Sequence, residues 1–182
     1  MWWSERSSPR GGAALALTLA LAACGFEPLY DPAGPAAAVA GRVEVEVIPR
    51  TAGYLMRERL VERLGPASEP THRLAIDLGF SQVGVAITED DVTSRFDVIG
   101  VADWRLTAFG AETPALAEEA RAVTGYSAPS SATTSAFAIL SARQDAEERL
   151  ALLLADRIAQ RIAVEAGDWA GAGARSAAEP AP

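Results

Sequence analysis

The sequence predicts an α+β domain in which a sheet of about four strands carries two helices on one face, in the order β-α-β-β-β-α. Three observations indicate this class. Four stretches alternate apolar and polar residues with a period of two, as half-buried strands do. Two others have apolar residues at helical spacing. The second of these is long and comes last, which predicts a long C-terminal helix.

The first strand and the first helix are predicted over residues 42–48 and 52–64. The valines that would form the buried face of the strand alternate with glutamates: Val43, Val45 and Val47. Pro49 ends this pattern. The apolar stripe of the helix consists of Met56, Leu60, Val61 and Leu64. Gly65 and Pro66 provide its stop signal.

A long hairpin is predicted next. In residues 72–80 one face carries Leu74, Ile76, Leu78 and Phe80, whereas the following valines, Val83 and Val85, and Ile87 have the opposite parity. We predict a bulge or turn near Ser81–Gln82, because one inserted residue reverses the facing of every later side chain. Glu89, Asp90 and Asp91 would form the hairpin tip. The third strand, residues 92–108, has one apolar face: Phe96, Val98, Ala102, Trp104 and Leu106.

A fourth strand over residues 118–126 and a loop over residues 127–135 precede the long helix, residues 136–166. Its apolar stripe consists of Phe137, Leu140, Ala151, Leu154, Ala155, Ile158 and Ile162. The opposite side carries Asp145, Arg149, Asp156 and Gln160. Two pairs of opposite charge are spaced for ion pairing along the helix: Asp145–Arg149 and Arg161–Glu165. At ~45 Å the helix is longer than the sheet is wide, so one end is expected to overhang.

The N-terminal segment has the pattern of a lipoprotein signal peptide. Arg6 and Arg10 form a basic start, and residues 11–23 are a run of small and apolar residues. This run is roughly a dozen residues long, whereas a membrane-spanning helix needs about 20. Cys24, the only cysteine, follows directly. We therefore expect cleavage between Ala23 and Cys24, with an S-diacylglycerol and an N-acyl chain, such as palmitate, on Cys24.

These patterns divide the chain into four regions. Residues 1–23 are the predicted signal peptide, and residues 24–41 are the lipidated N-terminus and an extended Pro/Ala-rich tether. Residues 42–167 form the domain, and residues 168–182 have the composition of a disordered tail. Gly25 stands where aspartate would signal retention in the inner membrane. We therefore expect an anchor in the outer membrane, on its periplasmic face.

The sequence offers few groups for catalysis or metal binding. His72 is the only histidine, and we expect it to be an exposed residue at a strand edge, without the orienting partner that a catalytic histidine needs. The sequence has no zinc-type His/Cys spacing, and residues 89–91 lack the pattern of a calcium loop. A net charge of −8 argues against nucleic acid as a partner. We therefore predict no enzyme activity, no cofactor and no metal site.

Arginines on the strands are the side chains most open to a binding function. Arg95 and Arg105 share one parity of the third strand, and Arg73 lies on the strand before it. The simplest interpretation is a solvated sheet face, since charged residues on one side of a half-buried strand need no further reason. The alternative is a set of guanidinium groups that bind the phosphates or carboxylates of a lipid.

The start of the mature chain resembles that of a known family. Residues 24–30 read Cys-Gly-Phe-Glu-Pro-Leu-Tyr and are followed by the tether and the β-α-β-β-β-α order. This combination resembles the lipopolysaccharide-assembly lipoproteins of the LptE family, in their alphaproteobacterial form. The resemblance implies an outer-membrane lipoprotein that plugs a large β-barrel partner, LptD, and helps it deliver lipopolysaccharide to the outer leaflet. Lipopolysaccharide itself is then a possible ligand.

Two other functions remain open at this point. One is a lipoprotein subunit of an ABC-type lipid transporter, which also combines a cysteine anchor with a small α/β domain. The other, more remote, is a periplasmic lipoprotein enzyme. A copurifying outer-membrane barrel, an inner-membrane ATPase complex, or turnover without any partner would distinguish the three.

Overall fold

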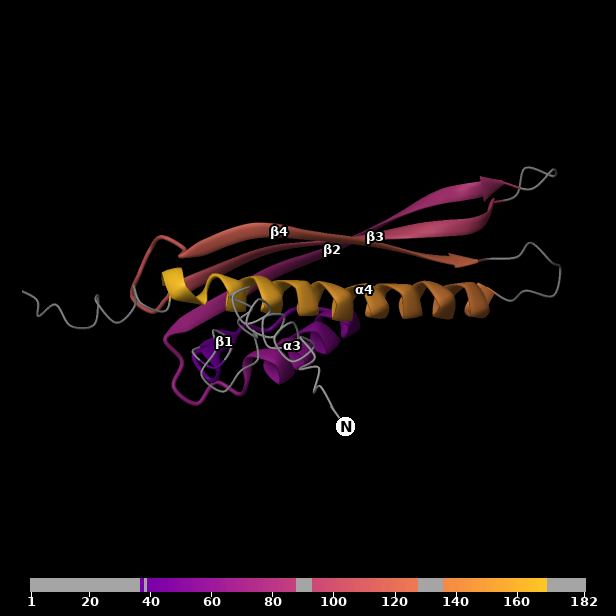
Figure 1. Ribbon diagram of the computed structural model, residues 1–182. Coiled ribbons are helices and arrows are strands. Elements are labelled where there is room, and N and C mark those ends of the chain that lie inside the picture. The colour runs from indigo at the N-terminus through magenta and orange to yellow at the C-terminus, as the bar shows by residue number, and fades with distance from the viewer. Residues whose placement is uncertain (1–36, 38, 88–92, 128–135, 170–182) are drawn as a thin grey trace, which may run out of the picture.

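The computed structural model describes residue 37 and residues 39–87, 93–127 and 136–169. Its elements are β1 (Val43–Val45), α3 (Thr51–Leu64), β2 (His72–Ile87), β3 (Thr93–Ala108), β4 (Leu116–Ser127) and α4 (Ala136–Val164) (Figure 1). This is the predicted order. No helix within the described ranges combines the length and the apolar character needed to span a membrane.

The four strands form one mixed sheet in the order β1-β2-β3-β4. β1 pairs with β2 in parallel, and the other two pairs are antiparallel. Both helices lie on the same side of the sheet, with α4 along β3 and β4 and α3 beside α4 (Figure 1). The predicted α+β class, with two helices on one face, is therefore confirmed.

β1 is shorter than predicted. Val43 and Val45 are buried, but Val47 is 84% exposed and Ile48 is buried in its place. Val47 was predicted to share the buried face, and that prediction is wrong. The period of two fails because the regular strand ends at Val45 and the chain then turns toward α3, so the pleat no longer decides which side chain faces the core.

α3 begins in a tight turn and ends at a glycine. A Cβ atom on Gly53 would lie 2.7 Å from the carbonyl oxygen of Ile48, so only glycine fits there. Gly65 has φ +81°, a left-handed conformation that other residues rarely adopt, and α3 ends just before it, as predicted. The predicted stripe faces the core, with Met56, Leu60 and Leu64 buried and Val61 partly buried.

β2 is one continuous strand. Its register with β3 is regular as far as Gly84 and shifts only between Gly84 and Ile87. The bulge predicted near Ser81–Gln82 is therefore wrong in position. Val83 keeps the parity of the face that no helix covers, whereas Val85 lies in the shifted part of the register; each is about half exposed. The prediction assumed that every valine faces one core, whereas here β2 and β3 twist away from α4 (Figure 1).

β3 and β4 extend the sheet much as predicted. β3 buries the even-numbered apolar residues Val98, Ala102, Trp104 and Leu106, with Phe96 partly buried. β4 starts two residues earlier and ends one residue later than the predicted range, residues 118–126. The hairpin pairing of β2 with β3 is confirmed. Its predicted tip, residues 89–91, and residues 128–135 of the predicted loop lie outside the described residues.

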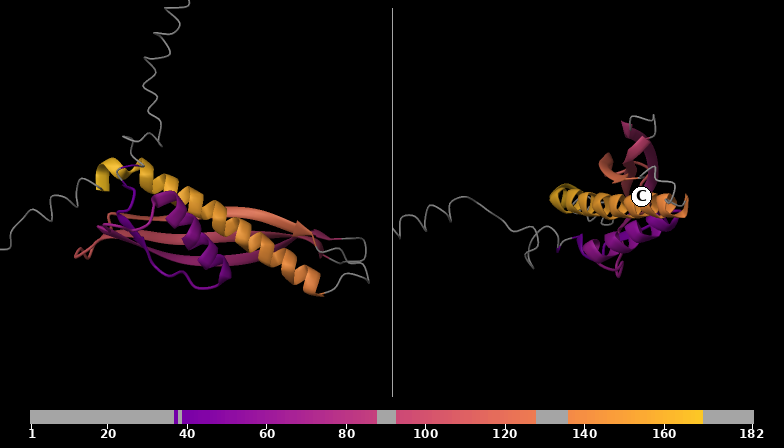
Figure 2. Two further views of the ribbon diagram at one scale, coloured as in Figure 1. Left: turned by 90° about the horizontal axis from the view of Figure 1, so that it is seen from below. Right: turned by 90° about the vertical axis from the view of Figure 1, so that its right-hand side faces the viewer.

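The predicted stripe of α4 holds in its C-terminal part only. Its buried members are Ala151, Leu154, Ala155, Ile158 and Ile162. Phe137 and Leu140 are instead 77% and 52% exposed, so the predicted burial of these two residues is wrong. α3 lies beside only the part of α4 nearer its C-terminus (Figure 2). The first turns of α4 have no second helix to pack against (Figure 2).

Arginine–carboxylate pairs hold α3 against α4. Asp156 was predicted to lie across from the core stripe, and it does, but it faces α3. Its Oδ1 accepts hydrogen bonds from the Nε atoms of Arg59 and Arg63, at 2.9 and 2.7 Å. Burial raises the pKa of Asp156, but the hydrogen bonds from these two arginines outweigh that effect, and its pKa lies below the ordinary value. Of the predicted pairs within α4, Arg161–Glu165 forms, at 2.6 Å.

The folded core extends beyond both predicted boundaries of the domain. Val39, assigned to the tether, is 1% exposed and belongs to the core. Trp169, assigned to the disordered tail, is 2% exposed, and its Nε1 donates a 3.0 Å hydrogen bond to the carbonyl oxygen of Ile162. The composition of the two segments did not predict this burial. One apolar side chain in an Ala-rich segment hardly changes the average hydrophobicity of that segment. Residues 170–182 lie outside the described residues.

Candidate functional surface

His72 is a packing residue. It is 2% exposed and lies between β1 and β3, so the predicted exposed edge position is wrong. Its ring meets Trp169 edge to face with 4.6 Å between centroids, and its Nδ1 is 2.9 Å from the hydroxyl of Thr71. Burial, and then the charge of Arg42, lowers the pKa of His72 and favours the neutral ring. Neither contact provides the orienting carboxylate that a general base needs.

The helical layer contains one hollow beside a buried carboxylate. It has a volume of 290 Å³ and is lined by Arg50, Thr51, Ala52, Gln144, Glu147 and Glu148. Glu147 is 8% exposed and accepts 3.0 Å hydrogen bonds from both Arg50 and Arg143. The charge of Glu147 is therefore compensated within the fold by two arginines. The described part of the chain contains no group of three potential metal ligands.

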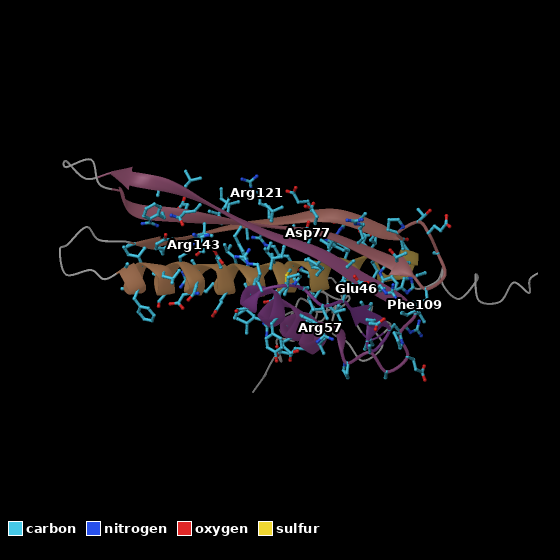
Figure 3. All side chains as sticks on the ribbon, turned by 180° about the vertical axis from the view of Figure 1, so that it is seen from behind. Glu46, Arg57, Asp77, Phe109, Arg121 and Arg143 are labelled. Carbon is cyan, nitrogen blue, oxygen red and sulfur yellow. The ribbon has the colours of Figure 1, made fainter. Side chains whose placement is uncertain are left out.

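The fold leaves the face of the sheet opposite the helices uncovered (Figure 1). It is formed by the odd-numbered residues of β2, β3 and β4, which the register places in rows across the three strands. We call it the open face; Figure 3 labels two of its residues, Asp77 and Arg121. Its apolar residues include Val83, Ile99, Val101 and Val123, and Val123 is 52% exposed.

The three arginines singled out in the sequence all lie on the open face but do not form one site. Arg73 pairs with Glu46 at 3.3 Å and lies over the ring of Phe109. Arg105 is exposed one row away. Arg95 lies ten residues from Arg105 along β3, or about 33 Å at the rise of a strand. One phosphate group cannot bridge Arg95 and Arg105.

A row of three carboxylates crosses the open face, and sequence reasoning missed it. Asp77, Asp103 and Glu119 are direct cross-strand neighbours on β2, β3 and β4. Like charges directly opposite each other destabilise a sheet. We call this set the acidic row. Each residue is unremarkable in its own strand, and only the register between strands reveals the alignment.

Comparisons with known proteins agree with this architecture. The profile of the LptE family, described as lipopolysaccharide-assembly, matches residues 40–162. The chain belongs to the LptE family. The match spans almost the whole described core, from the end of the predicted tether to the buried part of α4. No curated protein sequence matches the chain.

Solved structures share the fold of this LptE-family chain. A crystal structure of a provisionally assigned lipoprotein from Caulobacter crescentus CB15 has a TM-score of 0.57 at 20% identity, covering 75% of this chain and 98% of that one. The rare lipoprotein B from Shewanella oneidensis has a TM-score of 0.51 at 16% identity, covering 68% and 92%. An uncharacterised lipoprotein B from Nitrosomonas europaea has a TM-score of 0.50 at 12% identity, covering 69% and 83%.

Cys24, the predicted lipidation site, lies outside the described residues. The described chain nevertheless begins beside the core, since residues 37 and 39 are helical and Val39 is buried. Val39 follows Cys24 by only 15 residues (39 − 24) in the sequence, so a short stretch of chain joins the predicted anchor to the folded domain.

Proposed function

We propose that this LptE-family chain is an outer-membrane lipoprotein that plugs an LptD-type β-barrel and helps it deliver lipopolysaccharide to the outer leaflet. The observation that carries the proposal is the family match over residues 40–162. A plug needs a compact body with polar surfaces that suit a watery lumen. The open face, with its charged rows, provides one such surface.

Anchoring is proposed to occur through Cys24, on the periplasmic face of the outer membrane. A single acyl chain gives only marginal membrane binding, whereas two or three chains hold a protein stably. The S-diacylglycerol and N-acyl groups proposed for Cys24 would meet this requirement. Gly25, in place of aspartate, supports the outer membrane as the destination.

Contact with lipopolysaccharide is proposed to involve two separate places on the open face. Arg73 and Arg105 lie toward one end and Arg95 toward the other, so each end would engage a different anionic group of the lipid. Replacing Arg95 and Arg105 together should weaken lipopolysaccharide binding and make the residual binding less sensitive to salt.

Copurification and depletion test the proposed role. A tagged full-length chain should copurify with an LptD-type barrel from the outer membrane. Depletion of the chain should lower surface lipopolysaccharide and leave the barrel misassembled. Copurification with an inner-membrane ATPase complex instead, or unchanged lipopolysaccharide and barrel after depletion, would overturn the proposal.

The anchor is tested separately through Cys24. Cys24→Ala should leave an uncut precursor that lacks lipid, as read by intact mass. Cleavage at another position, or a mature chain without acyl groups, would contradict the assignment. Recovery of the mature protein mainly in the inner-membrane fraction of a density gradient would contradict the proposed sorting.

A further inference from the structure

The two edges of the sheet differ in how their backbone groups are covered. On β4 the outward-facing groups belong to the odd-numbered residues, because the even-numbered ones pair with β3. A guanidinium N–H of Arg157 donates to the carbonyl oxygen of Arg121, and Arg149 donates to that of Gly125 at 3.4 Å. α4 therefore places arginines along this edge, a form of protection against the addition of another strand.

The backbone of the opposite edge has no such cover. The guanidinium of Arg50 lies 5.3 Å from the centre of the Phe80 ring there, but it donates to Glu147 and to no backbone group of β2. β1 pairs only with the first three residues of β2, and the N–H of Glu46 makes one further bond, 3.0 Å to the carbonyl oxygen of Leu74. The chain then turns away toward α3. On this side the outward groups belong to the even-numbered residues. Among the described residues, the outward backbone groups of Leu78, Phe80 and Gln82 have no hydrogen-bond partner.

The acidic row ends at this uncovered edge. Two carboxylates of the row have an arginine two residues away on the same face of their strand. Arg105 follows Asp103 on β3, and Arg121 follows Glu119 on β4. The corresponding neighbours of Asp77 on β2 are Ala75 and Gly79, which carry no charge. None of the three carboxylates of the acidic row is in an ion pair with a described residue, but Asp77 alone lacks an arginine two residues away on its own strand; its nearest arginine on this face, Arg105, lies diagonally across on β3.

We infer that the edge of β2 beyond Leu74 receives an extended, cationic segment of the barrel partner as an added strand. This inference rests on the proposed function and specifies the contact. The added strand would bond to the outward groups of Leu78, Phe80 and Gln82 and continue the line of β1. Its apolar side chains would lie beside half-buried Leu78 and Phe80, and an arginine or lysine would lie opposite Asp77.

Charge favours this occupant over a second copy of the chain. Two copies of the chain would repel each other, because each has a net charge of −8. A second copy could also offer only its own uncovered β2 edge, since arginines cap its β4 edge. A cationic segment instead supplies the charge that the acidic row lacks. The same backbone pairing therefore costs less electrostatic energy with a basic partner.

Site-specific cross-linking tests where the partner lies. A photo-reactive residue replaces Gln82 on the uncovered edge or, as the matched control, Val123 on the capped edge, in the full-length lipoprotein. The binding partner in this experiment is the purified LptD-type barrel from the same organism. We expect cross-links from position 82 to one extended basic segment of the barrel and none from position 123. Equal cross-linking from both positions, or cross-links from position 82 only to a second copy, would overturn the inference.

Substitutions test the two parts of the contact. Gln82→Pro removes one outward N–H, and Asp77→Asn removes the charge, while the β2–β3 ladder keeps its bonds in both variants. Each should weaken barrel binding about five- to tenfold, the equivalent of one hydrogen bond or charge contact. Val123→Pro and Glu119→Gln make the same changes at the capped edge and should leave binding unchanged. Far-UV circular dichroism checks that each variant is folded.

The outcomes separate this inference from the proposed function. If the unsubstituted chain does not bind the barrel, both fail. If it binds, and Asp77→Asn and the position-82 cross-links behave like their controls, the proposed function stands and the strand addition is wrong. The cross-linking and Asp77→Asn arms decide the matter even if Gln82→Pro does not fold.

Discussion

The two ends of the molecule differ in how completely their apolar side chains are buried. At the end formed by β1, α3, the C-terminal half of α4 and Trp169, which we call the closed end, the sheet is covered by two helices and most large side chains are fully buried. The other end, which we call the open end, carries the far part of the β2–β3 hairpin and the first turns of α4. There only one helix accompanies the strands (Figure 2). There Val83, Val85 and Phe137 are 49%, 48% and 77% exposed.

This difference separates the part that stabilises the fold from the part available for contact. Burial of apolar area is the main source of stability, so the closed end should carry most of the free energy of unfolding. Exposed apolar side chains at the open end contribute little to it. These side chains remain exposed and therefore available for contact.

The largest effect is expected at Trp169. Trp169→Ala removes a side chain that packs on His72 and donates to the carbonyl oxygen of Ile162. It should lower the free energy of unfolding by ~3–5 kcal/mol, as burial of an aromatic residue implies. Val164→Ala, at an exposed position of the same helix end, is the control and should change little. Urea unfolding measures both variants. A neutral Trp169→Ala would place the boundary of the folded domain at Gly167, as the sequence predicted.

A comparison along α4 tests the two ends directly. Leu154 is fully buried at the closed end, and Leu154→Ala should cost ~2–5 kcal/mol. Phe137→Ala, in the first turns of the same helix, should cost no more than ~0.5 kcal/mol, because its side chain is exposed already. Chemical denaturation of both variants decides. Equal losses would mean that the open end belongs to the same cooperative core.

The bridge between α3 and α4 should have a smaller effect that depends on pH. Asp156→Ala should cost ~0.5–1 kcal/mol at neutral pH, because the pairs with Arg59 and Arg63 are partly exposed. The lowered pKa of Asp156 means that its contribution is complete above the ordinary aspartate pKa and is lost as pH falls through the lower folded-state value. Stability curves of the variant and the parent should therefore converge in acid. A difference that persists or grows at low pH would contradict this assignment.

The smallest effect on stability is expected for the arginines that cap β4. Replacing Arg149 and Arg157 together by alanine should change the free energy of unfolding by less than ~1 kcal/mol, since both are exposed. The change should instead appear in assembly, because it uncovers the second edge of the sheet. Sedimentation should show concentration-dependent association that the parent lacks. A strictly monomeric double variant would show that these side chains do not protect the edge.

Local patterns in the sequence were sufficient for most of the fold. Alternation in β3 and the helical stripes of Met56–Leu64 and Ala151–Ile162 each depend on one contiguous segment that packs against one layer, so the pattern translates directly into burial. The resemblance carried by residues 24–30 pointed to the family that residues 40–162 then match. The position of Cys24 at the end of an apolar run likewise predicts lipidation without reference to any fold.

Tertiary structure alone decided the features that involve separate segments. Phe137 and Val83 obey their local patterns yet are exposed, because no second layer reaches them, whereas Val47 is exposed because the strand ends before it. His72 and Trp169 are buried because the start of β2 meets the segment that follows α4, and no window of neighbouring residues can reveal this contact. The acidic row and the unequal edges of the sheet depend on strand register and on where α4 lies. Periodicity tells which side of an element is apolar, but only packing decides whether anything covers it.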